Sequence, residues 1–324
     1  MSKRIPMTFT LPDHWVWDFW LAHDGDTHHM MFLQAPMSLG DPDLRHRNAS
    51  VGYATSDDLR SWTVHGTVLE PSGGQAPDAT ATWTGSIVRT DADWRMFYTG
   101  SRFLREGEIT NVETVLAAAS DDLAAWTKDP AVVVSADPRW YETLAHGTWH
   151  EEAWRDPWVF ADPDGDGWHM LVTARAREGV SRDRGVIGHA WSADLRRWEV
   201  RPPLSAPGAG FAHLEVPQVV HVEGRWVLLF SCDSAHLAGA REGQVGGIWA
   251  VALDDPRGPY PVERATLVTD ESLYSGRIAQ DAEGRSVMLA FENTSSDGVF
   301  VGTLSDPVAV RWNDDRLETE GALR

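Results

Sequence analysis

The chain has 324 residues, with 48 acidic and 28 basic side chains for a formal charge of −20, one cysteine and 17 tryptophans. So acidic a surface repels nucleic-acid phosphates and anionic lipids, which excludes nucleic acid and membranes as expected partners. Cys232 stands alone, so an intrachain disulfide is excluded, and its apolar surroundings predict a packed thiol.

The N-terminal segment MSKRIPMTFTLPDHW contains no apolar stretch as long as that of a signal peptide. No apolar run long enough to span a bilayer follows it in the sequence. These two features predict a cytoplasmic protein.

Short apolar runs rich in β-branched and aromatic residues recur along the chain, each directly after a turn-rich cluster. Another strand candidate precedes each turn, so every pair is expected to form a hairpin. The first strands of these hairpins are expected at residues 14–22, 83–90, 154–161, 214–222 and 273–280. Five four-stranded units of this kind predict an all-β fold, a five-bladed β-propeller that residues 1–324 form as a single domain. We expect no C-terminal β-sandwich in addition to the propeller.

A second repeat has the form S-x-D-L-x-x-W and occurs at 56–62, 120–126 and 192–198. Its tryptophans, Trp62, Trp126 and Trp198, occupy one equivalent position of the repeat. We therefore expect them to pack between blades rather than to bind a ligand.

The innermost strand of each propeller blade lines a central channel, so the first strand of each hairpin is where distant side chains converge. Three of these strands carry a carboxylate among aromatic or apolar residues: Asp18 in WVWDFW, Asp156 in WRDPWVF and Glu215 in HLEVPQVV. A carboxylate is costly to bury unless it is paired or used. We expect the three to lie at matching positions of the repeat and to form the base of a funnel-shaped active site.

Carboxylates in a tryptophan-rich pocket suit glycoside cleavage. One carboxylate attacks or stabilises the anomeric carbon, and a second protonates the leaving oxygen. A third can hold ring hydroxyls, while aromatic faces stack on the sugar.

Two other patterns suggest metal sites at first sight. Asp162, Asp164, Asp166 and Gly167 imitate the start of a calcium loop, but Thr173 stands where the acidic twelfth ligand belongs, so a plain turn is expected. His28 and His29 lack a partner at zinc-ligand spacing. We expect no metal and no cofactor.

The motifs of the first four blades, in order, resemble the fructofuranosidase clan, which comprises glycoside hydrolase families 32 and 68. They are VWDFW with Asp18, WTGSIV at 83–88, FYTG at 97–100, RDP at 155–157 and EVPQVV at 215–220. The W-D-x-W and E-x-P-x-V-V forms look more like family 68. The resemblance implies Asp18 as nucleophile, Asp156 as transition-state stabiliser and Glu215 as acid/base.

The same resemblance implies a set of sugar contacts and a small carbohydrate as the partner. The implied sugar contacts are Trp17, Gln34, Trp83, Ser86, Arg155, Tyr274 and Arg277. The expected activity is retaining hydrolysis of terminal β-D-fructofuranosides such as sucrose or short fructo-oligosaccharides. Three alternatives stay open: a levansucrase-type fructosyltransferase, an inverting arabinofuranosidase or xylosidase of family 43 type, and a non-catalytic sugar-binding propeller. Oligomeric state is not indicated by the sequence.

Overall fold

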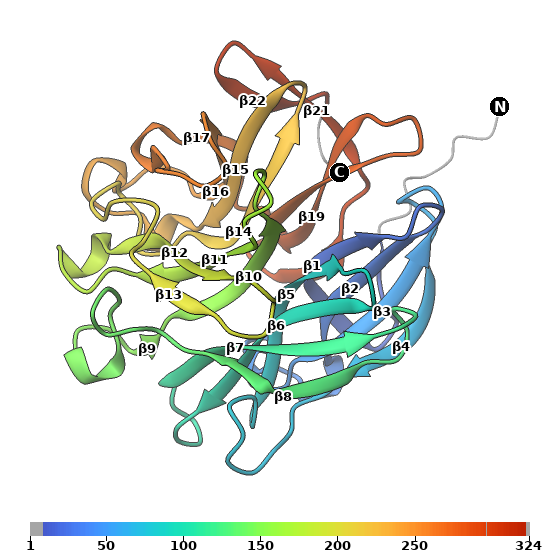
Figure 1. The fold of residues 1–324 in the computed structure, drawn as a ribbon, viewed down its shortest axis with the longest axis horizontal. Helices are drawn as coiled ribbons and strands as arrows, with labels where there is room; N and C mark the ends of the chain where they lie inside the picture. Colours follow the sequence, from blue (N-terminus) through green and yellow to red (C-terminus); the bar gives the residue numbers. More distant parts are fainter. Residues whose placement is uncertain (1–8, 296, 322–324) are drawn as a thin grey trace.

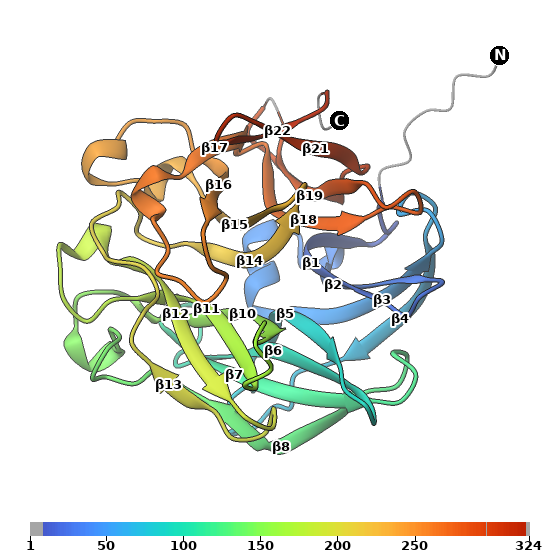
Figure 2. The same ribbon diagram turned by 45° about the horizontal axis from the view of Figure 1, so that its top comes forward.

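The structure is a computed structural model that describes residues 9–295 and 297–321. Five antiparallel sheets follow one another along the chain and are arranged as blades around a central axis (Figures 1 and 2). The predicted five-bladed β-propeller is therefore confirmed, and the described residues form the propeller without a β-sandwich beside it.

The blades contain mainly four strands each, ordered as in the sequence from the centre outwards. Blade 1 consists of β1 (His14–His23), β2 (His28–Pro36), β3 (Ser50–Ser56) and β4 (Thr63–Leu69). Blade 2 consists of β5 (Ala81–Arg89), β6 (Trp94–Phe103), β7 (Asn111–Ser120), β8 (Thr127–Val134) and the short β9 (Glu151–Glu152), which pairs with β7 in parallel. Blade 3 consists of β10 (Trp154–Ala161), β11 (Trp168–Arg175), β12 (Gly185–Ser192) and β13 (Glu199–Arg201).

Blades 4 and 5 complete the ring. Blade 4 consists of β14 (Glu215–Val222), β15 (Arg225–Cys232), β16 (Gly247–Leu253) and β17 (Thr266–Asp270). Blade 5 consists of β18 (Leu273–Gln280), β19 (Ser286–Thr294), β20 (Phe300–Leu304), β21 (Val308–Asn313) and β22 (Arg316–Thr319). The helices of the described residues are short 3-10 turns: η1 (Met37–Leu39), η2 (Pro42–Arg47), η3 (Leu144–His146), η4 (Ser181–Asp183), η5 (Ser234–His236), η6 (Gly239–Arg241) and η7 (Val262–Arg264). None of these is long and apolar enough to cross a membrane.

The ring is closed by the beginning of the chain. Phe9 exchanges two backbone hydrogen bonds with Leu304 of β20, at 3.1 and 3.0 Å, so the N-terminal segment is tied to the last blade. Figure 1 shows β1 and β19 side by side where the first and last blades meet. This closure fixes blade 1, and with it Asp18, against blade 5.

The S-x-D-L-x-x-W motif forms the same turn in three blades. In blade 1, the Asp58 side chain accepts hydrogen bonds from the backbone N–H groups of Arg60 and Ser61, at 2.8 and 2.7 Å. The intervening Leu59 is buried with a φ of 59°, so the turn drives an apolar side chain inwards from a left-handed backbone.

The tryptophans of this motif pack as expected. The ring of Trp198 in blade 3 meets Phe97 of blade 2 edge to face, with centroids 5.3 Å apart. Trp62 meets Phe9 of the closing segment at 6.3 Å, and Trp126 packs on the buried cluster shared by blades 1 and 2. Cys232 is fully buried in an apolar cluster, as predicted.

Every first strand has a bulge at the level of the channel. The register shifts after Trp17, Trp83, Arg155, Glu215 and Tyr274 in β1, β5, β10, β14 and β18. A bulge leaves an extra residue unpaired and re-aims the neighbouring side chains. The bulges thus define two rings of side chains: an upper ring of the five residues just named, and a lower ring of Asp18, Thr84, Asp156, Val216 and Ser275, which directly follow them.

This register corrects one expectation. Asp18 and Asp156 occupy matching positions in the lower ring, but Glu215 lies one residue earlier, in the upper ring. The reason is its place relative to the bulge: Glu215 is the last paired residue before it, as Arg155 is in blade 3, whereas Asp18 and Asp156 follow it. Of the three carboxylates, only two are therefore true repeat equivalents.

Candidate active site

A cavity of about 660 Å³ opens over the two rings. Its walls include all ten ring residues together with a rim from the connecting loops. Asp18, Asp156 and Glu215 line it together, although they stand up to about 200 positions apart in the sequence. The convergence predicted from the propeller pattern is thus observed.

Asp18 is held by two hydroxyl groups from neighbouring blades. Thr84 Oγ1 donates to Asp18 Oδ2 at 2.5 Å, and Ser275 Oγ donates to Asp18 Oδ1 at 2.6 Å. Both donors belong to the lower ring. A carboxylate that accepts at both oxygens has a fixed orientation and is presented to the cavity as an acceptor.

Asp156 is more deeply placed. Its Oδ2 accepts from Thr173 Oγ1 at 2.7 Å and from the Val216 backbone N–H at 3.1 Å. Burial raises its pKa to about 6, and the negative charges of Asp18 and Glu215 act in the same direction against the attraction of Arg155.

The lower ring also stores backbone strain. Asp156, Val216 and Ser275 have φ values of 58°, 53° and 51°, a left-handed region that a β-branched residue such as Val216 rarely adopts. Residues held in this region cluster at functional sites because surrounding contacts must impose them. Here the contacts that fix Asp156 and Val216 are the hydrogen bonds that orient the site.

Glu215 accepts from both sides of the upper ring. Arg155 Nη2 donates to its Oε1 at 2.7 Å, and the Tyr274 hydroxyl donates to its Oε2. Burial raises the pKa of Tyr274 well above its ordinary value, and the charge of Glu215 adds to this, so the phenol keeps its proton and remains a donor.

Arg155 is shared by four carboxylates. Besides Glu215, it contacts Glu113 at 3.0 Å, Glu151 at 3.0 Å and Asp156 at 3.6 Å. Burial opposes its charge, but the surrounding carboxylates outweigh burial and raise its pKa well above the ordinary value. Its charge is therefore permanent and central to the electrostatics of the cavity.

Glu113 and Glu151 respond differently to this arginine. Burial raises the pKa of Glu113 to about 8, and the attraction of Arg155 offsets it only in part. Burial also opposes the ionised form of Glu151, but there the charge of Arg155 prevails and lowers its pKa. One guanidinium cannot neutralise every carboxylate around it.

Four of the seven predicted sugar contacts line the cavity: Trp17, Trp83, Arg155 and Tyr274. The indole N–H of Trp83 donates to the backbone carbonyl of His46 at 2.8 Å, which fixes its ring at the rim. The remaining three predicted contacts lie elsewhere.

Gln34 and Ser86 are buried outside the cavity. The Gln34 amide donates to Thr67 Oγ1 at 2.8 Å within blade 1, and Ser86 Oγ accepts from the Val159 backbone N–H at 3.0 Å, joining blades 2 and 3. Because side chains alternate along a strand, both point away from the channel face. Their observed contacts are structural.

Arg277 lies beneath the active site rather than in it. Its guanidinium donates to the backbone carbonyls of Phe19, Val216 and Pro217, and it lies over the ring of Trp158 at 5.3 Å. Burial lowers its pKa to about 10. Arg277 thus ties three blades together below the lower ring.

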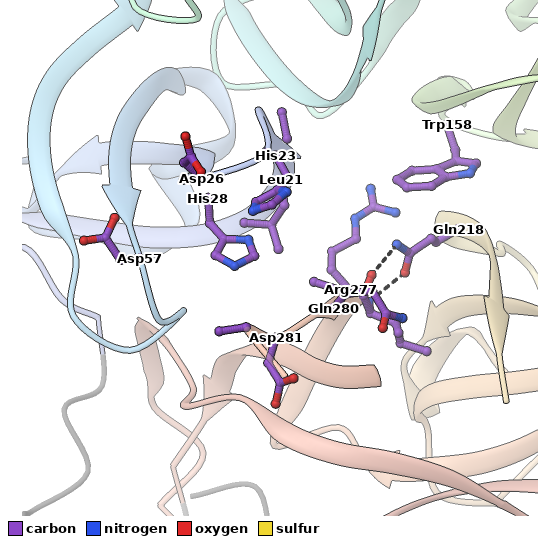
Figure 3. Close-up of a pocket in the computed structure, with 15 residues that line it drawn as sticks. Leu21, His23, Asp26, His28, Asp57, Trp158, Gln218, Arg277, Gln280 and Asp281 are labelled. Atoms are coloured by element: carbon purple, nitrogen blue, oxygen red, sulfur yellow. Dashed lines mark hydrogen bonds between the residues drawn. The ribbon is translucent and has the colours of Figure 1, made fainter. Parts of the chain in front are cut away.

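Arg277 also lines a second cavity, of about 510 Å³, beside Trp158 and Gln218 (Figure 3). There Gln218 exchanges hydrogen bonds with the backbone of Ile278, at 2.9 and 2.8 Å. His23, His28 and Asp281 lie on the other side of this cavity (Figure 3).

The described residues contain no group of three His, Cys, Asp or Glu side chains arranged to hold a metal ion. Asp162 accepts from the Asp164 backbone N–H at 2.8 Å and pairs with His169 at 2.7 Å, so the calcium-like segment is a turn, as expected. His29 contacts Tyr53 and Asp24.

The sequence reasoning missed several residues of the site. Thr84 and Ser275 were visible in the WTGSIV and LYSGRI strands, at the position equivalent to Asp18. Glu113 is a carboxylate within an apolar strand, the same signal that identified the other acids, but it lies on the third strand of blade 2. His236 and Asp233, which pair at 2.8 Å at the cavity wall, carried no sequence signal.

Comparison with known proteins identifies the family. Residues 21–316 match the model of the glycosyl hydrolases family 32 N-terminal domain. A curated relative, the "Extracellular sucrase" of Zymomonas mobilis, is 26% identical over 300 residues, which cover 79% of this chain and 71% of the relative.

Solved structures share the fold. An inulosucrase from Halalkalicoccus jeotgali bound to kestose superposes with a TM-score of 0.81 at 24% identity, over 99% of this chain and 93% of that chain. The levansucrase from Gluconacetobacter diazotrophicus gives a TM-score of 0.74 at 19% identity, over 99% and 82%.

These comparisons confirm the resemblance to the fructofuranosidase clan and correct the expected location. The cytoplasmic location predicted from the N-terminal segment is contradicted, because the curated relative is an extracellular sucrase. The family model is that of family 32, although two motifs look more like family 68, and it removes the family 43 alternative. Since the model spans most of the sequence, the chain belongs to glycosyl hydrolase family 32 and is a glycoside hydrolase that acts on fructosides.

Proposed function

We propose that the protein hydrolyses terminal β-D-fructofuranosides, such as sucrose or short fructo-oligosaccharides, with retention of configuration. The observation that carries this proposal is the arrangement of Asp18 and Glu215 on one cavity, oriented by consecutive residues of one strand. Ser275 donates to Asp18 and Tyr274 donates to Glu215. Two carboxylates fixed at one cavity are what glycosidic cleavage requires, and retention requires them about 5–5.5 Å apart.

In this mechanism, Asp18 attacks the anomeric carbon of the fructosyl unit while Glu215 protonates the leaving oxygen. A covalent fructosyl-enzyme forms, and Glu215 then takes a proton from the water that releases fructose. Asp156 holds hydroxyls of the furanose ring, and hydrogen bonds there strengthen as oxocarbenium charge develops. The indole rings of Trp17 and Trp83 form the apolar wall on which the sugar packs.

The test is product analysis with the purified chain. Sucrose from low to high concentration should yield equal amounts of free glucose and fructose, and NMR of the first turnovers should show the β-anomer of fructose. Initial release of the α-anomer would overturn the retaining mechanism. Glucose in large excess over fructose, with new oligosaccharides, would instead establish a fructosyltransferase, which uses the same carboxylates but passes the fructosyl group to a sugar hydroxyl.

Turnover by Glu215→Ala in the presence of azide refines this test. A small anion can attack a fructosyl-enzyme without general-base help. Formation of β-fructosyl azide is therefore expected. Its absence would count against a covalent intermediate on Asp18.

A further inference from the structure

Glu113 is a carboxyl group with no contact to the cavity's reacting carboxylates and no exposed side-chain surface. It lies on β7, the third strand of blade 2, and reaches the site from behind. Its Oε2 accepts from the Trp154 backbone N–H at 3.0 Å, and both of its oxygens accept from Arg155 Nη1, at 3.2 and 3.0 Å. Because the carboxyl is buried, these hydrogen bonds hold the Arg155 guanidinium in place.

The guanidinium of Arg155 is a rigid planar fork. Its Nη1 end is fixed by Glu113, with Glu151 beside it at 3.0 Å, and its Nη2 end reaches Glu215 Oε1 at 2.7 Å. Because the plane is rigid, the position of Nη1 decides where Nη2 lies. Glu113 therefore has geometric control over the contact between Arg155 and Glu215.

We propose that Glu113 is a positioning residue of the catalytic centre, which anchors the Nη1 end of Arg155 so that its Nη2 end and its positive charge are directed at Glu215. The proposal rests on the function proposed above, in which Glu215 is the acid/base. Glu113 itself does not touch the substrate.

Charge balance explains why a neutral anchor serves best. Arg155 is surrounded by Glu113, Glu151, Asp156 and Glu215, and burial favours the protonated form of Glu113 because its pKa is raised. A protonated Glu113 still accepts from Arg155 but withdraws little of its charge. More of that charge then acts on the carboxylates that face the cavity.

Asn111 also holds Glu113. Its Nδ2 donates to Glu113 Oε1 at 3.4 Å and to Ser101 Oγ at 3.2 Å. The anchor is therefore itself fixed by side chains of blade 2.

A double-mutant cycle tests the proposal, with kcat and KM for sucrose measured on the full chain. Glu113→Ala should lower kcat about 100-fold, since small displacements of positioned groups have effects of this size. Glu113→Gln, which imitates the protonated carboxyl, should restore kcat to within about fivefold of wild type. If Glu113→Ala does not fold, Glu113→Asp, which withdraws the carboxyl from Arg155, takes its place in the cycle.

The decisive comparison is with Arg155→Ala. If Glu113 acts through Arg155, the double variant should match Arg155→Ala within about threefold, whereas independent effects would multiply. Multiplying effects, or full activity in Glu113→Ala, would overturn the proposal. Glu178→Ala, at an exposed position, is the matched control.

Failure of the proposed function would be distinguishable from failure of this inference. If the wild-type chain cleaves no fructoside, the function fails while the geometry can still be measured in crystals. Glu113→Ala should then separate Arg155 Nη2 from Glu215, and Glu113→Gln should not. An unchanged contact in Glu113→Ala would reject the positioning role whatever the activity.

Discussion

Tyr274 and Ser275 are consecutive residues of β18, yet they orient two different carboxylates: Tyr274 donates to Glu215, and Ser275 donates to Asp18 at 2.6 Å. The bulge in β18 makes this possible, because it turns adjacent side chains towards the same cavity. The last blade thus sets the relative placement of the two groups proposed to act on either side of the glycosidic bond.

Replacement of Asp18 tests the nucleophile. Asp18→Asn keeps the shape of the side chain and its hydrogen-bonding oxygen but removes the attacking charge, so turnover of sucrose should fall at least about 10⁴-fold. Binding of sucrose, followed by calorimetry, should persist. Unchanged turnover would remove Asp18 from this role.

Replacement of Tyr274 tests the orientation of Glu215. Tyr274→Phe removes only the hydroxyl, and a hydrogen bond to a charged group is worth about 1.5–3 kcal/mol. We expect kcat to fall about 10- to 100-fold while the melting temperature changes little. The edge contact between Tyr274 and Phe291 remains in the variant and acts as an internal control for packing. A wild-type kcat would show that Arg155 alone orients Glu215.

The buried carboxyl of Asp156 predicts a pH dependence of stability. Its pKa is raised from 3.8 to about 6 by burial, so the folded state binds more protons than the unfolded state between these values. The contribution of this group to the unfolding free energy is fully present below pH 4 and declines as the pH rises to 6, by up to about 3 kcal/mol.

Asp156→Asn should lack this decline. Its amide oxygen can accept from Thr173 and Val216, as Oδ2 does, but it does not titrate. The melting temperature of the variant relative to wild type should therefore rise between pH 4 and pH 6. Asp91→Asn, at an exposed turn, is the matched control, and a constant difference across this range would contradict the raised pKa.

Arg277 should be important for stability rather than for sugar binding. Arg277→Met removes the donor to the carbonyls of Val216 and Pro217, and an unsatisfied buried acceptor costs about 1–3 kcal/mol. Unfolding by urea should reveal a loss of this order or larger, with the KM for sucrose of the folded variant nearly unchanged. Arg196→Met, on an exposed turn, should have little effect, and a selective increase in KM for Arg277→Met would restore it as a sugar contact.

Much of the fold could be predicted because its signals are local. The apolar runs after turn clusters located the hairpins, and the S-x-D-L-x-x-W motif encodes a turn through the Asp58 side chain and the left-handed Leu59. Asp18 and Asp156 could be placed at the central channel because each is a carboxylate among the aromatic residues of a first strand. These patterns depend on a few neighbouring residues and can be read from the chain alone.

The errors have non-local causes. Arg277 stands in a first strand, as the cavity-lining Tyr274 and Ser275 do, but two residues beyond Ser275 it projects below the lower ring. Ser86 and Gln34 alternate away from the channel face. Glu113 and Glu151 enter the site from β7 and β9, behind the innermost strands, and no sequence pattern reports which outer residues reach inwards.

The sequence by itself determined the five-bladed ring and the three carboxylates that meet on its axis, because strand periodicity and turn chemistry are properties of short segments. Only the tertiary structure decided how those carboxylates are oriented. The bulge of each first strand re-aims the residue that follows it, and the single charge of Arg155 is divided among Glu113, Glu151, Asp156 and Glu215, which are up to about 100 residues apart. Electrostatic sharing of this kind depends on distances across blades and on burial, which exist only once the ring has closed.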